Sequence, residues 1–344
     1  MEKIMTAIPE PTITTASLID AHHEAHQDLP RPHLGASLLG HYCERNLWLT
    51  FRWVKPERFS GRILRLFRRG QNEESIIISD LRAIGIDVKT TNGSQDRVDF
   101  GNHVSGSMDG IALSGVPEAP KSQHVLEFKT HSKKSFDDLE KNGLEKSKPQ
   151  HFAQCQVYML GSKIDRALYV AVCKDDDRYY FERVKLDKAL AQKYVDKGHR
   201  LVSEPNLPPP ISEDSTWYQC RICSHHKFCH ASALPEVNCR TCAHSTPLPD
   251  STWRCERHDA DAIPVDFQRT GCDNHALHPD LVPWDMDQEA STEWEPVYII
   301  DGNRVVNGES GYLSTEIIAN PSMCAMDDAN VQALRDEFDA RIVG

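Results

Sequence analysis

Apolar residues along the first two thirds of the chain alternate between helix-like and strand-like spacings. Spacings of three and four residues predict helices in the segments 33–53, 62–85, 148–162 and 188–204. Short apolar runs predict strands at 86–91, 97–113 and 124–130, and residues 166–187 have the pattern of a hairpin with an Asp-rich turn. Predicted strands and helices therefore alternate along this part of the chain.

The segments that flank this region have a different character. Residues 1–32 are polar and contain four prolines, so we predict a loose arm there. Residues 205–215 form a proline-rich linker, and seven cysteines follow between positions 220 and 272. Beyond residue 276 the chain is acidic, and we predict one hairpin at 296–310 with an Asp-Gly turn and one helix at 327–342.

The predicted strand "HVLEFKT" carries two opposite charges inside an apolar run. Side chains alternate between the faces of a strand, so Glu127 and Lys129 point the same way. A second acid, Asp109, precedes the apolar run "IAL" and suits the end of a neighbouring strand. Two converging carboxylates repel each other unless a cation lies between them. A few oxygen ligands with open positions suit Mg²⁺ or Mn²⁺, which activates water against a phosphodiester. A lysine on the same face stabilises the negative charge that develops. The competing interpretation is an exposed ion pair on an edge strand, which contributes little to stability.

These residues resemble the PD-(D/E)XK nuclease superfamily, and in particular its RecB-like and phage-exonuclease branch. Asp109 and the segment from Glu127 to Lys129 match the acid and the E-x-K strand of that family. The helix segment from Gly70 to Glu74 matches its G-x-x-x-E signature, and "QCQVY", from Gln154 to Tyr158, matches its Q-h-x-x-Y element. Met108 stands where many members have proline.

The resemblance covers residues 33–232 and implies an α/β, restriction-endonuclease-like fold, in which helices flank a mixed central sheet. It implies hydrolysis of a DNA phosphodiester that leaves a 5′-phosphate. The residues that it assigns to the active site are Glu74, Asp109, Glu127, Lys129, Gln154 and Tyr158. Of these, Glu74, Asp109 and Glu127, with the backbone carbonyl of Phe128, would hold Mg²⁺ or Mn²⁺, and Lys129 would position the attacking water. Basic residues that we expect to contact phosphates are Arg62, Arg65, Arg68, Arg69, Lys133 and Lys134.

The first group of cysteines is one ligand short of a four-ligand site for a soft metal. It comprises Cys220, Cys223 and Cys229, and spacing alone does not single out the fourth ligand. The candidates for that ligand are Cys43, His225, His226 and His230. Iron–sulfur nucleases of the superfamily, including those of CRISPR adaptation and the AddAB-type enzymes, place one cysteine before the nuclease core and three after it with this spacing. The resemblance therefore favours Cys43 and a structural [4Fe–4S] cluster, with zinc held by three cysteines and one histidine as the alternative.

The second group of cysteines lies outside the pattern of the family. Cys239, Cys242, Cys255 and Cys272 fall in a short, loop-rich stretch that begins with a C-x-x-C pair, and this is typical of structural zinc. His258 or His275 is an alternative to one of the thiolates, and a second iron–sulfur cluster is the alternative to zinc. The remaining cysteines, Cys155, Cys173 and Cys324, are isolated, and we expect them to be packing residues.

Charge is distributed unevenly along the chain. The net charge of the whole chain is −12, but residues 231–344 contain 21 acidic residues, seven arginines and no lysine. Residues 1–230 are therefore nearly neutral, and the acidic tail favours contact with a protein partner over nonspecific DNA binding. The chain has neither an apolar run of about 18 residues, which a membrane span needs, nor a signal-type N-terminus, so we expect a cytoplasmic protein of a bacterium or a phage-infected cell.

The sequence therefore predicts four parts and one leading function. The parts are an arm (1–32), a nuclease domain (33–232), a cysteine-rich zinc module (233–280) and an acidic segment (281–344). The leading function is a metal-dependent DNA exonuclease of recombination, repair or end processing, acting on single-stranded DNA or duplex ends and related to phage enzymes. The alternatives are an endonuclease, an end-trimming nuclease of CRISPR adaptation, and a non-catalytic adaptor for a helicase or single-strand annealing partner. Cleavage polarity, strand preference and oligomeric state are left open.

Overall fold

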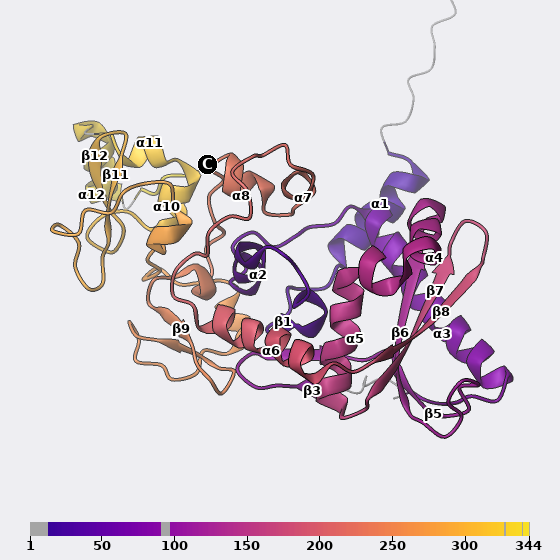
Figure 1. The fold of residues 1–344 in the computed structure, drawn as a ribbon. Helices are drawn as coiled ribbons and strands as arrows, with labels where there is room; N and C mark the ends of the chain where they lie inside the picture. The colour runs from indigo at the N-terminus through magenta and orange to yellow at the C-terminus, as the bar shows by residue number, and fades with distance from the viewer. Residues whose placement is uncertain (1–12, 91–96, 327, 339, 344) are drawn as a thin grey trace, which may run out of the picture.

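The centre of the protein is a mixed five-stranded sheet (Figure 1). The computed structural model describes residues 13–90, 97–326, 328–338 and 340–343. The strand order is β2-β5-β6-β7-β8, in which β6 and β7 are parallel and the other neighbours are antiparallel. The strands are β2 (Asp87–Lys89), β5 (Gly110–Ser114), β6 (His124–His131), β7 (Arg166–Cys173) and β8 (Tyr179–Lys185). The predicted α/β class is confirmed.

Two helices cover the two faces of this sheet: α3 (Gly61–Ala83) and α5 (Pro149–Ser162). Leu126 and Phe128 of β6 share an apolar cluster with Ile77 of α3. Val125, on the opposite face of β6, belongs to a larger cluster that includes Val157 of α5. Since side chains alternate along a strand, Glu127 and Lys129 share the face of Val125, toward α5.

Further elements pack around this core. The helices are α2 (Glu44–Phe51), α4 (Lys133–Ser147) and α6 (Lys188–Ser203), with the short 3₁₀ helix η1 (Ala36–Leu38). A second sheet has the order β1-β4-β3 and consists of β1 (Leu34–Gly35), β3 (Arg97–Asp99) and β4 (Val104–Ser107). A Cβ atom at Gly106 would lie 2.7 Å from the Cβ of Ala36 and 2.8 Å from the Cε1 of Tyr158. Glycine at this position therefore lets α5 approach the small sheet closely.

The predicted helices at 62–85, 148–162 and 188–204 and the hairpin at 166–187 are confirmed to within a few residues. The helix predicted over 33–53 is wrong in its first half. Residues 34–38 form β1 and η1, and the helix begins only at Glu44. One reason is that Leu34 and Gly35 pair with Val104 and Ser105 of β4.

The arm predicted at 1–32 is not loose where the structure describes it. Helix α1 (Thr15–Ala25) begins with a capping box in which Thr14 and Ser17 exchange side-chain-to-backbone hydrogen bonds. It packs on α3 through an ion pair between Asp20 and Arg65, and Glu24 accepts a hydrogen bond from the Gly61 amide at 2.8 Å. The part of this prediction that falls on residues 1–12 lies outside the described residues.

The C-terminal third consists of short elements beside the main core (Figure 1). Its helices are α7 (Tyr218–Arg221), α8 (His226–His230), η2 (Cys239–Thr241), α9 (Val265–Gln268), η3 (Pro279–Leu281), α10 (Ser314–Ala319), α11 (Pro321–Cys324) and α12 (Ala329–Phe338). Its strands form two hairpins, β9 (Ser245–Pro247) with β10 (Trp253–Cys255), and β11 (Val297–Ile300) with β12 (Asn303–Val306). The predicted Asp-Gly turn is confirmed, because Asp301 and Gly302 both have positive φ values, 49° and 83°. In the described part of the chain, none of the helices combines the length and the apolar character that crossing a bilayer requires.

Candidate active site

The candidate site forms where β5 and β6 separate. Gly110 pairs with Leu126, and one residue earlier Asp109 leaves the ladder. The Oδ2 atom of Asp109 instead accepts a hydrogen bond from the backbone amide of Phe128 at 2.8 Å. This bond holds the Asp109 carboxylate beside the E-x-K segment of β6, as the sequence predicted from neighbouring strands.

The two carboxylate oxygens of Glu127 have different surroundings. Glu127 is completely buried, and its Oε1 atom accepts a hydrogen bond from the ammonium group of Lys129. The same ammonium group lies 3.1 Å from the carbonyl oxygen of Phe128. The Oε2 atom of Glu127 is buried and has no hydrogen-bond partner among the described residues. A buried carboxylate oxygen without a partner is costly, and a cation would satisfy it.

The electrostatics of the site couple three acids to one lysine. Burial raises the pKa of Glu127 to about 8; Lys129 opposes this shift, and the charges of Asp109 and Glu74 add to it. Burial and the Asp109 charge raise the pKa of Glu74 to about 7. Burial also raises the pKa of Asp109. Burial disfavours the Lys129 ammonium, but the charges of Glu127 and Asp109 outweigh it and raise the pKa of Lys129. Such a set of acids accepts a divalent cation, which favours their ionised forms.

Glu74 reaches the site from α3 across a groove. The groove has a volume of about 340 Å³ and is lined by Gly70, Glu74, Lys129 and Lys174, with Phe67 as an aromatic wall. Glu74 interacts electrostatically with Asp109 and Lys129. Its neighbour Glu73 also lines the groove but interacts with Tyr179 of β8 instead. Glu74 is therefore the acid of this helix that faces the cluster.

Gln154 and Tyr158 lie one turn apart on the face of α5 that covers the sheet. Both are buried, and the Gln154 side-chain amide donates a hydrogen bond to the Tyr158 hydroxyl at 3.3 Å. Burial and the Glu127 charge raise the pKa of Tyr158, so its hydroxyl keeps its proton. The acids, Lys129 and Tyr158 are thus coupled electrostatically, and a hydrogen bond to Tyr158 links Gln154 to them.

Sequence reasoning missed a polar group behind Glu127. Tyr169 of β7 is in register with Glu127, and its hydroxyl lies 2.9 Å from both His131 Nε2 and His151 Nδ1. Burial and the Lys129 charge lower the pKa of His151 to about 3, and burial and the Lys148 charge lower that of His131 to about 4. The imidazoles are therefore neutral and hydrogen-bond to a neutral hydroxyl. The available signal was the spacing of His151 and Gln154, which share one face of a helix.

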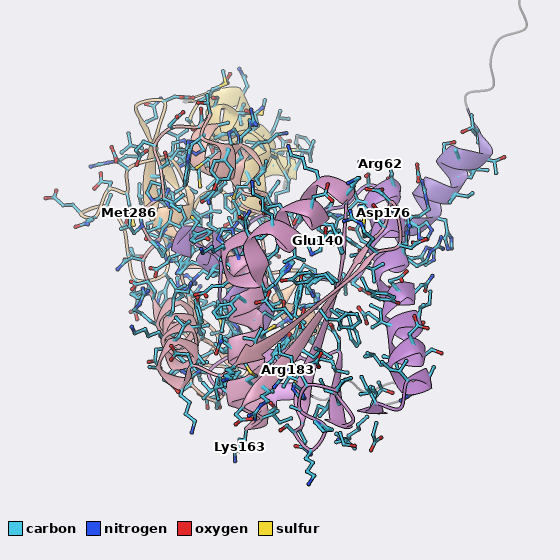
Figure 2. All side chains as sticks on the ribbon, turned by 45° about the vertical axis from the view of Figure 1, so that its right-hand side comes forward. Arg62, Glu140, Lys163, Asp176, Arg183 and Met286 are labelled. Carbon is cyan, nitrogen blue, oxygen red and sulfur yellow. The ribbon has the colours of Figure 1, made fainter. Side chains whose placement is uncertain are left out.

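The basic residues that we expected to contact phosphates have different partners within the protein. Arg65 pairs with Asp20, Lys133 with Asp137, and Arg69 donates to the carbonyl of Lys174 at 2.9 Å. In Figure 2, Arg62 and Asp176 of the β7–β8 turn lie toward the upper end of the sheet, and Arg183 lies toward its lower end. The groove lies toward the same end as Asp176, since Lys174 follows directly after β7.

The first cysteine group converges on one cavity. Cys43, Cys220, Cys223 and Cys229 all line it, together with His226 and His230. Asn46 of α2 contacts two of the sulfurs: its backbone amide donates to Cys43 Sγ at 3.4 Å and its side chain to Cys223 Sγ at 3.2 Å. The candidate ligand His225 faces elsewhere, and its Nε2 atom lies 3.0 Å from the Thr50 hydroxyl.

The second cysteine group converges in the same way. Cys239, Cys242, Cys255 and Cys272 line one cavity with His258. The alternative ligand His275 also borders it, but its ring nitrogens are engaged with Ser314 and with Thr241 and Asn238. Among the described residues, no group of three or more His, Cys, Asp or Glu side chains is arranged closely enough to hold a metal ion. Metal at either cysteine group, or at the carboxylates, is therefore a proposal based on the donor set. The isolated thiols of Cys155, Cys173 and Cys324 are buried.

Comparison with known proteins finds similarity at the level of solved structures. No known family's sequence model matches the chain, and no curated protein matches it. The crystal structure of SSO0001 is 16% identical, with a TM-score of 0.39, and the match covers 63% of this chain and 96% of that one. The alkaline exonuclease LHK-Exo of Laribacter hongkongensis is 15% identical, and the match covers 54% of this chain and 90% of that one. Its TM-score is 0.33, and that of LHK-Exo in complex with dAMP is 0.36. Because each TM-score lies below 0.5, the function is argued below from the side chains of this chain alone.

Proposed function

We propose that the protein is a DNA exonuclease that depends on a divalent metal and hydrolyses a phosphodiester to leave a 5′-phosphate. The observation that carries this proposal is the buried, unpartnered Oε2 atom of Glu127 beside Asp109, Glu74 and Lys129. A divalent cation held by the acids, together with the lysine, would attract a phosphate group of DNA that enters the groove in front of them.

The chain's own groups would divide the work as follows. Glu74, Asp109, Glu127 and the Phe128 carbonyl would hold Mg²⁺ or Mn²⁺. When bound, the ion would supply polarisation of the phosphodiester and activation of water. Lys129 is held beside both Glu127 Oε1 and the Phe128 carbonyl, so its ammonium is placed to orient the nucleophile and to offset developing negative charge.

Two residues of α5 complete the proposed site. The Tyr158 hydroxyl keeps its proton and accepts the hydrogen bond of Gln154, so it remains able to donate to a phosphate oxygen. The neutral His131, Tyr169 and His151 group would brace β6 and β7 behind Glu127 without adding charge.

The proposed setting is recombination, repair or DNA end processing by a phage-related enzyme. We also propose a helicase or a single-strand annealing protein as a partner. We also propose a structural [4Fe–4S] cluster at Cys43, Cys220, Cys223 and Cys229, supported by their convergence on one cavity.

The decisive experiment digests end-labelled linear DNA and closed circular DNA with Mg²⁺ or Mn²⁺. We expect loss of linear DNA only, and Lys129→Ala should abolish it while leaving the fold intact. Lys185→Ala is the matched control, because that lysine is an exposed residue of strand β8 in the same sheet. If Lys129→Ala cuts as wild type does, the site assignment is wrong. DNA binding without cleavage under all metal conditions would favour the adaptor alternative, and cleavage of the circle would favour an endonuclease.

A further inference from the structure

The second cysteine cavity lies next to a buried contact that joins the C-terminal region to the main core. Arg240, inside the C-x-x-C pair, is 1% exposed. Its guanidinium donates to the carbonyls of Phe51 and Pro32 and to the Gln268 side chain, each at 2.9 Å. It also stacks on Trp53, 3.6 Å from the ring centroid. A residue of the cysteine loop is thus anchored between segments that precede and follow α2.

Three arginines lie close together at this contact. The guanidinium carbons of Arg52 and Arg240 lie 5.6 and 4.9 Å from the Trp253 ring centroid, and that of Arg269 lies 4.8 Å from the Trp53 centroid. Among the residues that the structure describes, Arg52, Arg240 and Arg269 form no ion pair with a carboxylate. Nitrogen atoms of Arg52 and Arg269 are buried without hydrogen-bond partners. Aromatic faces attract these cations, and Asp280 interacts with Arg52, but the buried Arg240 and the half-buried Arg269 still need a nearby negative charge.

Burial raises the pKa of the Cys239, Cys242 and Cys272 thiols, and backbone amides beside two of these sulfurs oppose that shift. The backbone amide of Ala276 donates to Cys242 Sγ at 3.4 Å, and the amide of His244 also hydrogen-bonds this thiol. The thiol of Cys272 has a similar bond to the backbone of Asn274. Amide donors stabilise thiolates, which are the metal-binding form of cysteine.

We propose that Cys239, Cys242, Cys255 and Cys272 hold one Zn²⁺ ion, and that this site anchors the C-terminal region to the main core through Arg240. Four thiolates and one Zn²⁺ ion carry a net charge of −2, which offsets the arginine cluster beside them. The ion also fixes the loop between Cys239 and Cys242, so the Arg240 side chain enters its aromatic box in one orientation. This inference does not depend on the proposed nuclease activity.

Metal content tests the site on the full-length protein. Wild type, purified without added metal, should carry one zinc per chain by mass spectrometry. The double variant Cys255→Ser/Cys272→Ser should lose that zinc and keep its iron content. Cys324→Ser, which removes a buried thiol outside the cluster, should keep both. Unchanged zinc in the double variant, zinc-free wild type, or a fall in iron instead of zinc would each overturn the proposal.

A second measurement does not require the double variant to fold. An organomercurial that titrates the thiols of wild type should release one equivalent of zinc per chain to a coloured zinc indicator. No release would overturn the site.

Limited proteolysis tests the anchoring role. Arg240→Gln should keep its zinc but be cleaved several-fold faster between residues 205 and 237. Arg254→Gln is the control, because that arginine lies in the same segment but pairs with Asp259 at the surface. If Arg240→Gln is cleaved at the wild-type rate, the anchoring role is wrong even where zinc is bound.

Discussion

At the scale of single residues, burial gives Glu127 a carboxylate whose charge is only partly compensated. Its backbone lies in a strand whose neighbours are apolar, so the side chain is fully removed from water. Lys129 satisfies one carboxylate oxygen and leaves the other without a partner. An ionised carboxylate in this position needs a second cation, because one ammonium group faces three acids.

The pH dependence of stability follows from these shifts. The folded-state pKa values of Glu127, about 8, and Glu74, about 7, lie above their ordinary value of 4.5. Between pH 4.5 and these folded-state values, Glu127 and Glu74 hold protons in the folded protein that they have released in the unfolded chain. The stability that they contribute is therefore full below pH 4.5 and is lost as the pH rises through 7 to 8.

We therefore expect Mn²⁺ to raise the melting temperature more at pH 8 than at pH 6, because the ion replaces protons at these acids. Differential scanning fluorimetry measures the two shifts. Glu127→Gln should largely remove the Mn²⁺ effect, whereas Glu140→Gln, an exposed acid of α4 paired with Arg178, should keep it. Equal Mn²⁺ shifts at both pH values would contradict the assignment of these carboxylates as ligands.

At the scale of elements, the position of α5 depends on how closely it approaches the small sheet. Gly106 of β4 provides the contact for Tyr158, and Gly40 provides one for Ala153. Both contacts join residues that are far apart in the chain, so the sequence of α5 predicts a helix but not how closely that helix approaches the small sheet. That depth places Gln154 and Tyr158 beside Glu127 and Lys129.

Replacing Gly106 with alanine should destabilise the fold by about 1–3 kcal/mol, because the new methyl group overlaps Ala36 and Tyr158. Gly70→Ala in α3 is the control. Its Cβ would meet only the Thr130 hydroxyl at 3.9 Å, so this change should stabilise the helix by about 0.5–1 kcal/mol. Urea unfolding measures both free energies. A Gly106 variant as stable as wild type would show that α5 is not held at this contact.

At the scale of the whole molecule, two groups of cysteines join distant parts of the chain. Cys43 caps α2 near the start of the main core, and Cys220, Cys223 and Cys229 follow its last helix. A metal cluster between them would close a loop of about 180 residues, which makes the entropic gain large. The second group lies beside Trp253, which belongs to the same apolar cluster as Phe51.

Protein purified without oxygen should be coloured and contain about four iron atoms per chain, as a [4Fe–4S] cluster requires. Cys43→Ser should bleach the absorbance and lower the melting temperature, whereas Cys173→Ala, which removes a buried thiol of β7, should keep the colour. Colourless wild type with two zinc ions per chain would exclude the cluster and leave the nuclease proposal intact.

The chain's pattern and spacing were sufficient for the long elements around the candidate site. Helix α3, helix α5 and the β7–β8 hairpin are long, so the spacing of their apolar residues predicts each element even where single positions break the pattern. The short elements were harder, because residues 34–38 and α1 depend on contacts with β4 and α3. Tertiary pairing overrides local propensity in such segments.

The sequence by itself determined which chemical groups are present and their order: the acids, the E-x-K strand, the two cysteine groups and the Asp-Gly hairpin. Only the tertiary structure decided that Glu127 Oε2 is left without a partner and that Tyr169 bridges two histidines behind it. It also decided that Arg240 leaves the cysteine loop to enter the main core. The physical reason is that burial and pairing depend on residues far apart in the chain, whereas periodicity and spacing depend on near neighbours.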